Sequence, residues 1–435
     1  MMNYIQRFTK NRVAKNAGWL IGGKILQMLI SFFVGVLTTR FLGPSNYGLI
    51  NYGTTYINFF LPLCTLGLNS IMVREIINHP KREGTVIGTA LMMRLMASTL
   101  AVILINLIVS VVDAGESLTR LVVFLTSFSV IFNSFEILNY WFQSRLESKI
   151  SAIANLIAFI VFSLYRIILI VTGKGVEYFA FATSIDYIVI AIILFYAFRR
   201  STDQKLTFNL NVGKDMLSRS YHFILPSIMV AVYGQTDKFM LKHMISSSEI
   251  GYYSTAQTIC TLWCFVLTAI IDSMYPSIME ANKDANESQF KHLNILLYRI
   301  VFYVSMGVSA VICVFAPLIV SILYGSQYSP TVMPLRIITW YTAFSYLGVA
   351  REAWIVGKNR QKYLKYIYIS AAVSNVILNL LLIPRWGSAG AAIASLIAEI
   401  MTSVVIPFLI PGMRENAVLM LNAIFFRDTR KGENA

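Results

Sequence analysis

Long blocks of apolar residues, each about 20 residues in length, recur along this 435-residue chain. A block of this length forms an α-helix that crosses about 30 Å of hydrocarbon, whereas a membrane β-strand needs only about 10 residues of alternating pattern. Charged residues make up 13% of the chain, well below the level of about 25% in soluble proteins. We therefore predict an all-α integral membrane protein with about twelve transmembrane helices. The predicted spans are about 16–38, 47–71, 86–111, 119–142, 150–171, 177–198, 221–245, 251–273, 293–316, 332–354, 364–383 and 388–411.

Lysine and arginine lie mainly on one side of these spans. With a cytoplasmic N-terminus, the inside segments hold about 25 of them and the outside segments about 5. This bias predicts a multi-pass protein with both termini in the cytoplasm, and it accounts for the net charge of +15 without nucleic acid. The first apolar segment leads directly into further spans, so we expect a retained helix and not a cleaved signal peptide.

The second half of the chain repeats the pattern of the first. Residues 40–48 (RFLGPSNYG) match 243–251 (HMISSSEIG) at a shift of 203, and residues 141–149 match 354–362 at a shift of 213. Because each copy has six spans, both copies share one orientation, with a path expected between them. The predicted parts are an N-terminal lobe at 1–198, a cytoplasmic linker at 199–219, a C-terminal lobe at 220–411 and a cytoplasmic tail at 412–435 that begins with a short interfacial helix.

Two charges stand in the farther half of the predicted span 221–245, at Asp237 and Lys238. A charge costs roughly 2.5–3.5 kcal/mol at the centre of a bilayer, so a pair inside one span favours a wet cavity or buried partners. We place both residues at the cavity and take Asp237 as the candidate for binding a coupling proton or Na⁺. The alternative is that Asp237 only neutralises a nearby cation.

A polar stripe follows one face of the span 47–71. Its members are three or four residues apart, which places them on one side of a helix. Asn51 and Asn58 are its candidates for lining the cavity, and tight helix packing by small and polar residues is the alternative. The stripe consists of Asn51, Thr55, Asn58, Pro62, Thr65 and Asn69.

Several classes of site are missing from the sequence. There is no Gly-x-x-x-x-Gly-Lys-Ser/Thr loop for a nucleotide, and the four cysteines and four histidines show no metal-ligand spacing. No loop is long enough to fold as a catalytic domain, and a channel would need a pore loop. We therefore expect no catalytic residue, no metal and no cofactor, and coupling to a proton or Na⁺ gradient stays open.

Three motifs carry a resemblance to a known family. They are residues 39–48 (TRFLGPSNYG), residues 237–241 (DKFML) with 249–256 (EIGYYSTA), and residues 382–395 (LIPRWGSAGAAIAS). Together they resemble bacterial polysaccharide flippases of the Wzx type, in the superfamily that also contains the multidrug and toxin extrusion (MATE) transporters. The resemblance covers about residues 16–411 and implies a MATE-like fold of two six-helix lobes around a central cavity.

The resemblance implies a substrate and the membrane in which the protein acts. The activity would be translocation of undecaprenyl-diphosphate-linked oligosaccharide units from the inner to the outer leaflet of the bacterial plasma membrane by alternating access, for cell-surface polysaccharide such as O-antigen. The polymerase and other assembly proteins would be partners. A cation-coupled exporter of small drugs is the alternative function. A membrane enzyme of the same pathway is a third, which a long outer loop or acidic catalytic cluster would favour.

Lys24, Arg94 and Arg299 are the cations expected to meet such a diphosphate. By the predicted topology their helices begin inside, so all three lie in the inner half of the bilayer. Arg94 and Arg299 correspond at a shift of 205, as expected of a pair beside a shared cavity, and guanidinium groups bind phosphate oxygens in a bidentate way. The alternative is that both arginines reach the inner headgroups and anchor their helices.

Overall fold

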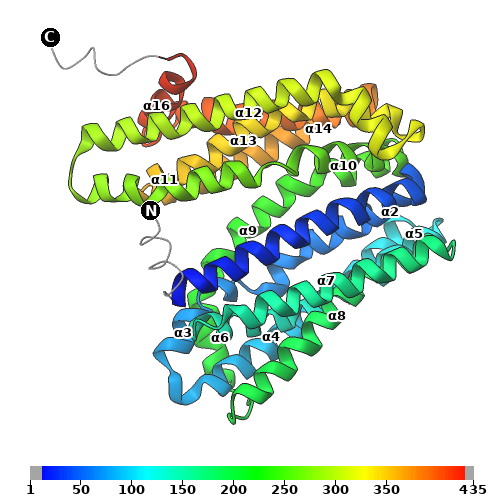
Figure 1. Cartoon of the computed structure of the whole chain (residues 1–435), viewed down its shortest axis with the longest axis vertical. Coiled ribbons are helices and arrows are strands. Elements are labelled where there is room, and N and C mark those ends of the chain that lie inside the picture. Colours follow the sequence, from blue (N-terminus) through cyan, green and yellow to red (C-terminus); the bar gives the residue numbers. More distant parts are fainter. Residues whose placement is uncertain (1–11, 427–435) are drawn as a thin grey trace, which may run out of the picture. The chain divides into compact units, whose positions relative to one another are not determined.

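The computed structural model describes residues 12–426, with side chains for residues 27, 28 and 30–426, and every regular element in this part of the chain is helical. The chain divides into two compact units, Met1–Ala231 and Val232–Ala435. The division falls inside one long helix, α9 (Leu210–Met244), which contributes residues to both units (Figure 1).

The N-terminal unit packs long helices beside one another, with α7 and α8 side by side (Figure 1). Its first helix, α2, changes direction at Gly43, whose φ of 71° and ψ of 170° are not helical, and Pro44 follows. The turn predicted between the first two spans therefore lies inside α2. The elements are α2 (Arg12–Thr65), η1 (Leu68–Ser70), α3 (Met72–Asn78), η2 (Pro80–Arg82), α4 (Glu83–Val112), α5 (Ser117–Asn133), η3 (Ser134–Glu136), α6 (Ile137–Ser144), α7 (Ser148–Val171) and α8 (Val176–Ser201).

The C-terminal unit contains a matching break in α14, at Gly387 with a φ of 52°. A positive φ is easy only for glycine, so this residue allows the chain to reverse between the last two predicted spans. The remaining elements are α10 (Ser247–Thr261), α11 (Phe265–Lys283), α12 (Glu287–Tyr324), η4 (Ser326–Thr331), α13 (Val332–Gly357), η5 (Gln361–Tyr363), α14 (Leu364–Ile400), the π-helical turn η6 (Met401–Val405), α15 (Ile406–Leu409) and α16 (Arg414–Ile424).

Helix length and composition confirm a multi-pass membrane protein. Within the described residues, six helices are long and apolar enough to cross a membrane, or seven if the bent pair α10 and α11 forms one span. One of the six, Gln361–Leu409, holds two of the predicted spans on either side of Gly387. The total of about twelve spans remains a prediction.

The start of α9 differs from the predicted span, which began at residue 221. The helix begins at Leu210 because the side chain of Asn209 caps it: its Oδ1 accepts hydrogen bonds from the backbone N–H groups of Asn211 (3.0 Å) and Val212 (3.2 Å). Only residues 202–209 of the predicted linker are therefore non-helical.

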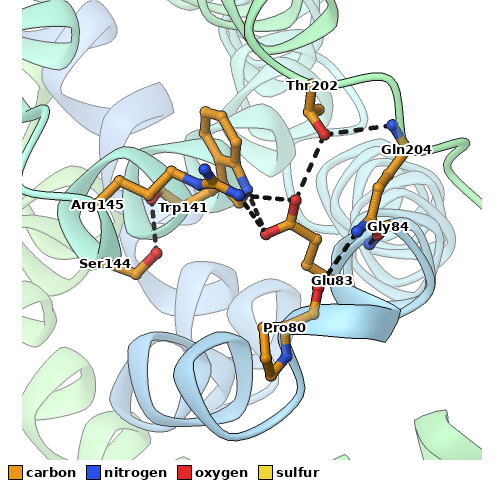
Figure 2. Close-up of polar contacts among 8 residues, drawn as sticks. All are labelled: Pro80, Glu83, Gly84, Trp141, Ser144, Arg145, Thr202 and Gln204. Atoms are coloured by element: carbon orange, nitrogen blue, oxygen red, sulfur yellow. Dashed lines mark hydrogen bonds and ion pairs between the residues drawn. The ribbon is translucent and has the colours of Figure 1, made fainter.

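An ion pair recurs at equivalent places in the two units. In the first unit Arg145 contacts Glu83 at 2.9 Å (Figure 2), and in the second Lys358 contacts Glu287 at 2.5 Å. The two acids are 204 residues apart and the two bases 213, which are the shifts of the sequence repeat. In both units the base follows, four residues later, a tryptophan that is fully buried. The repeat is therefore present in the contacts of each unit.

Candidate cation site

Asp237 is a buried carboxylate in the C-terminal unit, with 5% of its surface exposed. Three neutral side chains donate hydrogen bonds to it, each at 2.5 Å. The hydroxyls of Tyr253 and Ser395 both donate to Oδ2, and the amide nitrogen of Asn379 donates to Oδ1. Asp237 makes no ion pair with the described residues, so the hydrogen bonds that it accepts from them all come from neutral donors.

The donors to the carboxylate also contact one another and one further amide. The Tyr253 and Ser395 hydroxyls are 3.0 Å apart, and the amide of Asn379 also donates to Oδ1 of Asn375 at 2.9 Å. Oδ1 of Asn379 and Nδ2 of Asn375 are buried without a hydrogen-bond partner. Unpartnered buried amide atoms are costly, and a rotation of the Asn379 amide would turn its carbonyl oxygen toward Asp237.

The break at Gly387 assembles this site. Asn375 and Asn379 are one turn apart on the first part of α14, and Ser395 lies on the part after the break. Because the chain reverses at Gly387, side chains that are distant along α14 meet at Asp237 of α9. Tyr253 completes the site from α10.

The ligand chemistry fits a monovalent cation or a proton. Carboxylate, hydroxyl and amide oxygens are the donors that hard cations prefer. One carboxylate supplies one negative charge, which a single Na⁺ or proton would neutralise. Within the described residues no group of three or more His, Cys, Asp or Glu side chains is placed to hold a metal ion.

A further polar group lies one turn beyond Ser395, at Glu399. Its Oε2 accepts hydrogen bonds from the hydroxyls of Tyr233 at 3.0 Å and Thr402 at 2.8 Å. The buried Arg351 donates to the backbone carbonyl of Thr402 at 3.0 Å. This carbonyl belongs to the π-helical turn η6, and such turns free backbone groups and are frequent at functional sites.

Arg94 is enclosed within the N-terminal unit, with 1% of its surface exposed. It donates to Oδ1 of Asn69 at 3.2 Å and to the side-chain and backbone oxygens of Asn133 at 2.9 and 3.2 Å. Asn133 in turn donates to Oε2 of Glu136 at 2.9 Å. Arg94 therefore ties α4 to η1 and α5 and does not extend to lipid headgroups.

Arg299 has different surroundings although it corresponds to Arg94 in the repeat. Its guanidinium carbon lies 4.7 Å from the centre of the Phe426 ring, just beyond α16. Lys24 lies outside the part of the chain whose side chains are described. Asn51 and Asn58 are half-buried on α2, where Asn51 donates to the backbone oxygen of Tyr47 at 2.9 Å.

The predicted site residues fall in different units. Asn51, Asn58 and Arg94 lie in the N-terminal unit, and Asp237, Lys238 and Arg299 lie in the C-terminal unit. Asp237 and the half-buried Lys238 adjoin each other, as their sequence positions require. The predicted set lacks Tyr253, Asn375, Asn379 and Ser395, which complete the site around Asp237. Two signals in the sequence pointed to them: Tyr253 and Ser395 belong to motifs, and the two asparagines interrupt an apolar span at a spacing of four.

Long apolar helices, an internal repeat and a buried carboxylate held by neutral donors together define a multi-pass membrane transporter. The chain belongs to the polysaccharide biosynthesis protein family, whose profile matches residues 13–282. It is also similar to the capsular polysaccharide biosynthesis protein CapF of Staphylococcus aureus, with 19% identity over 401 residues that cover 89% of this chain and 96% of CapF.

Two solved structures share the fold. The lipid II flippase MurJ in an inward closed conformation has a TM-score of 0.71 at 15% identity, covering 93% of this chain and 90% of MurJ. An inward-facing multidrug resistance MATE family transporter has a TM-score of 0.67 at 16% identity, covering 91% of this chain and 96% of the transporter. The predicted MATE-like all-α architecture and the family resemblance are thereby confirmed.

Proposed function

We propose that this protein is a flippase that moves undecaprenyl-diphosphate-linked oligosaccharide units from the inner to the outer leaflet of the bacterial plasma membrane. The observation that carries the proposal is the family match, extended over nearly the whole chain by the similarity to CapF. The fold shared with the flippase MurJ supports movement of a lipid-linked substrate. Polymerase and other assembly proteins would then receive the product.

The membrane orientation follows from the distribution of charge. With both termini in the cytoplasm, the segments rich in lysine and arginine face inward. The ion pair of Arg145 with Glu83 and that of Lys358 with Glu287 then lie at the cytoplasmic ends of their units. The lipid-linked substrate is expected to enter from this side.

Asp237 is the proposed coupling residue. Its carboxylate accepts three hydrogen bonds from neutral donors. Binding of Na⁺ or a proton would cancel the charge, and the hydroxyls of Tyr253 and Ser395 would turn their oxygens toward the cation. Charge cancellation matters because an isolated charge costs roughly 2.5–3.5 kcal/mol inside a bilayer. The cation would thus determine which conformation is favoured.

Lys24, Arg94 and Arg299 remain the proposed cations for the substrate diphosphate. For Arg94, binding phosphate means exchanging neutral acceptors on Asn69 and Asn133 for an anionic one. The bonds to the asparagines already have a charged donor, so what the phosphate adds is its own negative charge and two oxygens that can accept from one guanidinium in a bidentate way. Asn51 and Asn58 would provide polar contacts on α2.

Glycan export tests the function. A host strain that lacks its own flippase and accumulates lipid-linked oligosaccharide is complemented with this protein, and surface polysaccharide and drug tolerance are both measured. Restored surface polysaccharide with unchanged drug tolerance is the expected result. Increased drug tolerance without export would replace the proposal by small-molecule export, the function named for the MATE neighbour.

A further inference from the structure

Residues 202–209, which we term the linker strap, lie along the first turns of α4 in the N-terminal unit. The strap and α4 are joined at three positions in the first two turns of the helix. Gly84 donates its N–H to Oε1 of Gln204 at 2.9 Å, and the hydroxyls of Thr85 and Thr207 are 2.9 Å apart. One turn later Oγ1 of Thr89 accepts the backbone N–H of Asn209 at 3.0 Å.

Two glycines on α4 make room for the strap. A Cβ atom on Gly84 would lie 2.5 Å from the backbone oxygen of Lys205, and one on Gly88 would lie 2.7 Å from both the backbone nitrogen and oxygen of Thr207. Both contacts are with backbone atoms, which cannot move aside as a side chain can. Small residues four apart allow close approach of two backbones, and here the second backbone is the strap.

An ion pair between the buried Glu83 and the half-exposed Arg145 anchors the start of the strap (Figure 2). Glu83 is 4% exposed and accepts a hydrogen bond from the indole N–H of Trp141 at 3.1 Å and two from Arg145 at 2.9 Å. Thr202 adds a weaker one at 3.4 Å, and Gln204 also donates to the backbone oxygen of Pro80 at 3.2 Å. The strap therefore begins on an interaction that also joins α4 to α6 and the turn after it.

The attachment continues into the first turns of α9. Arg219 donates to Oε1 of Glu75 at 2.9 Å, and the hydroxyl of Ser220 donates to the backbone oxygen of Leu66 at 2.8 Å. Gly67, with a φ of 65°, would place a Cβ atom 2.5 Å from the backbone oxygen of Ser220. From residue 202 to residue 220, the connection is thus fixed to the N-terminal unit.

We propose that the linker strap stays docked on α4 throughout transport, so that residues 202–220 move as part of the N-terminal unit. A flexible tether between two moving lobes needs neither a glycine groove nor a buried anchor. Undocking would break the hydrogen bonds of Gly84, Thr85 and Thr89 to the strap at once, together with the weaker one from Thr202 to the buried Glu83. Changes between the two units would then be confined to α9 beyond Ser220.

A reversible crosslink tests whether the strap stays docked. Because the Thr85 and Thr207 hydroxyls are 2.9 Å apart, sulfur atoms in the double variant Thr85→Cys/Thr207→Cys can reach the bonding distance of about 2.05 Å. Purified protein is reconstituted in proteoliposomes with the lipid-linked oligosaccharide fraction of the host membrane, and flipping is measured after oxidation and after reduction. Oxidised wild-type protein and the single variant Thr85→Cys control for the four native cysteines.

The expected result is a flipping rate that oxidation changes less than twofold. A rate that falls more than tenfold on oxidation and returns on reduction would overturn the proposal, because the strap would then have to leave α4 in each cycle. Failure of the wild-type protein to flip this substrate would count against the proposed function instead. The two failures are therefore distinguishable.

A glycine substitution tests whether docking is needed. Gly88→Ala should lower flipping at least tenfold at equal protein level, whereas Gly307→Ala, on α12 with no atom within 4 Å of the added Cβ, should have no effect. If Gly88→Ala lowers the protein level, the double cysteine variant, which keeps both glycines, still tests whether the strap stays docked. Full flipping by Gly88→Ala would overturn the proposal.

Discussion

Replacing Asp237 by asparagine removes the one carboxylate that the described residues contribute to the candidate cation site, and it keeps the shape of the site. A cation about 4 Å from a carboxylate gains about 4 kcal/mol at an effective dielectric constant of about 20. Each 1.4 kcal/mol corresponds to a factor of ten, so Asp237→Asn should weaken cation binding about 100- to 1000-fold. The Tyr253 and Ser395 hydroxyls would also lose their anionic acceptor.

The assay compares flipping in proteoliposomes with and without an imposed gradient, first of Na⁺ and then of protons. For wild-type protein one of the two gradients should accelerate flipping, which identifies the coupling ion. For Asp237→Asn the rate with that gradient should fall to the rate without it. Asp113→Asn is a matched control, because Asp113 is also 5% exposed and accepts a hydrogen bond from a tyrosine, Tyr52, at 2.8 Å, but lies in the other unit.

Full gradient dependence in Asp237→Asn would refute the reasoning. The buried carboxylate would then serve only to join α9, α10 and α14 through its three hydrogen bonds. An equal loss in Asp113→Asn would refute it as well, since the effect would follow from removing any buried acid. Only a loss confined to Asp237→Asn identifies the coupling site.

Three further predictions concern other parts of the chain. Cysteine labelling should find position 205 accessible from the cytoplasm and position 247 from outside; the reverse at position 247 would contradict the topology. Arg94→Lys should lose most glycan export at unchanged protein level, because an ammonium cannot copy the bidentate geometry of a guanidinium; near-normal export would leave Arg94 a structural role only. The hydrogen bond from Lys358 lowers the pKa of Glu287, so the pair stabilises the fold above the ordinary value of 4.5 and this contribution is lost as pH falls below it. Because both groups are partly exposed, the loss should be only about 0.2–1 kcal/mol, as measured by thermal unfolding at several pH values. It should be smaller in Lys358→Met, where Lys291, 3.5 Å from Glu287, still lowers the pKa of that carboxyl.

Local chemistry made the turns predictable from the sequence. The glycines at 43 and 387 occur in motifs that end one apolar block and begin the next, and the structure breaks a helix at each. Asp237 was predictable because a lone acid in an apolar span is costly without a function or a partner. The extension of α9 to Leu210 was missed because its cap, Asn209, lies in a polar segment that also fits a linker.

The pairing of Asp237 with Asn379 and Ser395 was not predictable because these residues are distant from it in sequence. Asn379 lies 142 residues away and Ser395 158, and their approach depends on how α14 reverses at Gly387. Arg94 and Arg299 show that a match in the sequence repeat does not determine the surroundings of a side chain. They match in sequence, yet one is enclosed by asparagines and the other stacks on an aromatic ring, because neighbours from other helices determine a side chain's surroundings.

The repeat produces two similar scaffolds, but within the described residues only one of them holds the candidate cation site. At the shifts of the repeat, the positions equivalent to Asp237, Asn379 and Ser395 are Val34, Ile167 and Thr183, which carry no charge and a single hydroxyl. A single carboxylate binds a single Na⁺ or proton, so the flipping rate should rise with cation concentration along a simple hyperbola. The measurement is a cation titration in proteoliposomes at fixed substrate. A sigmoidal dependence would require a second cation site, and Asp237 would then be only one of two.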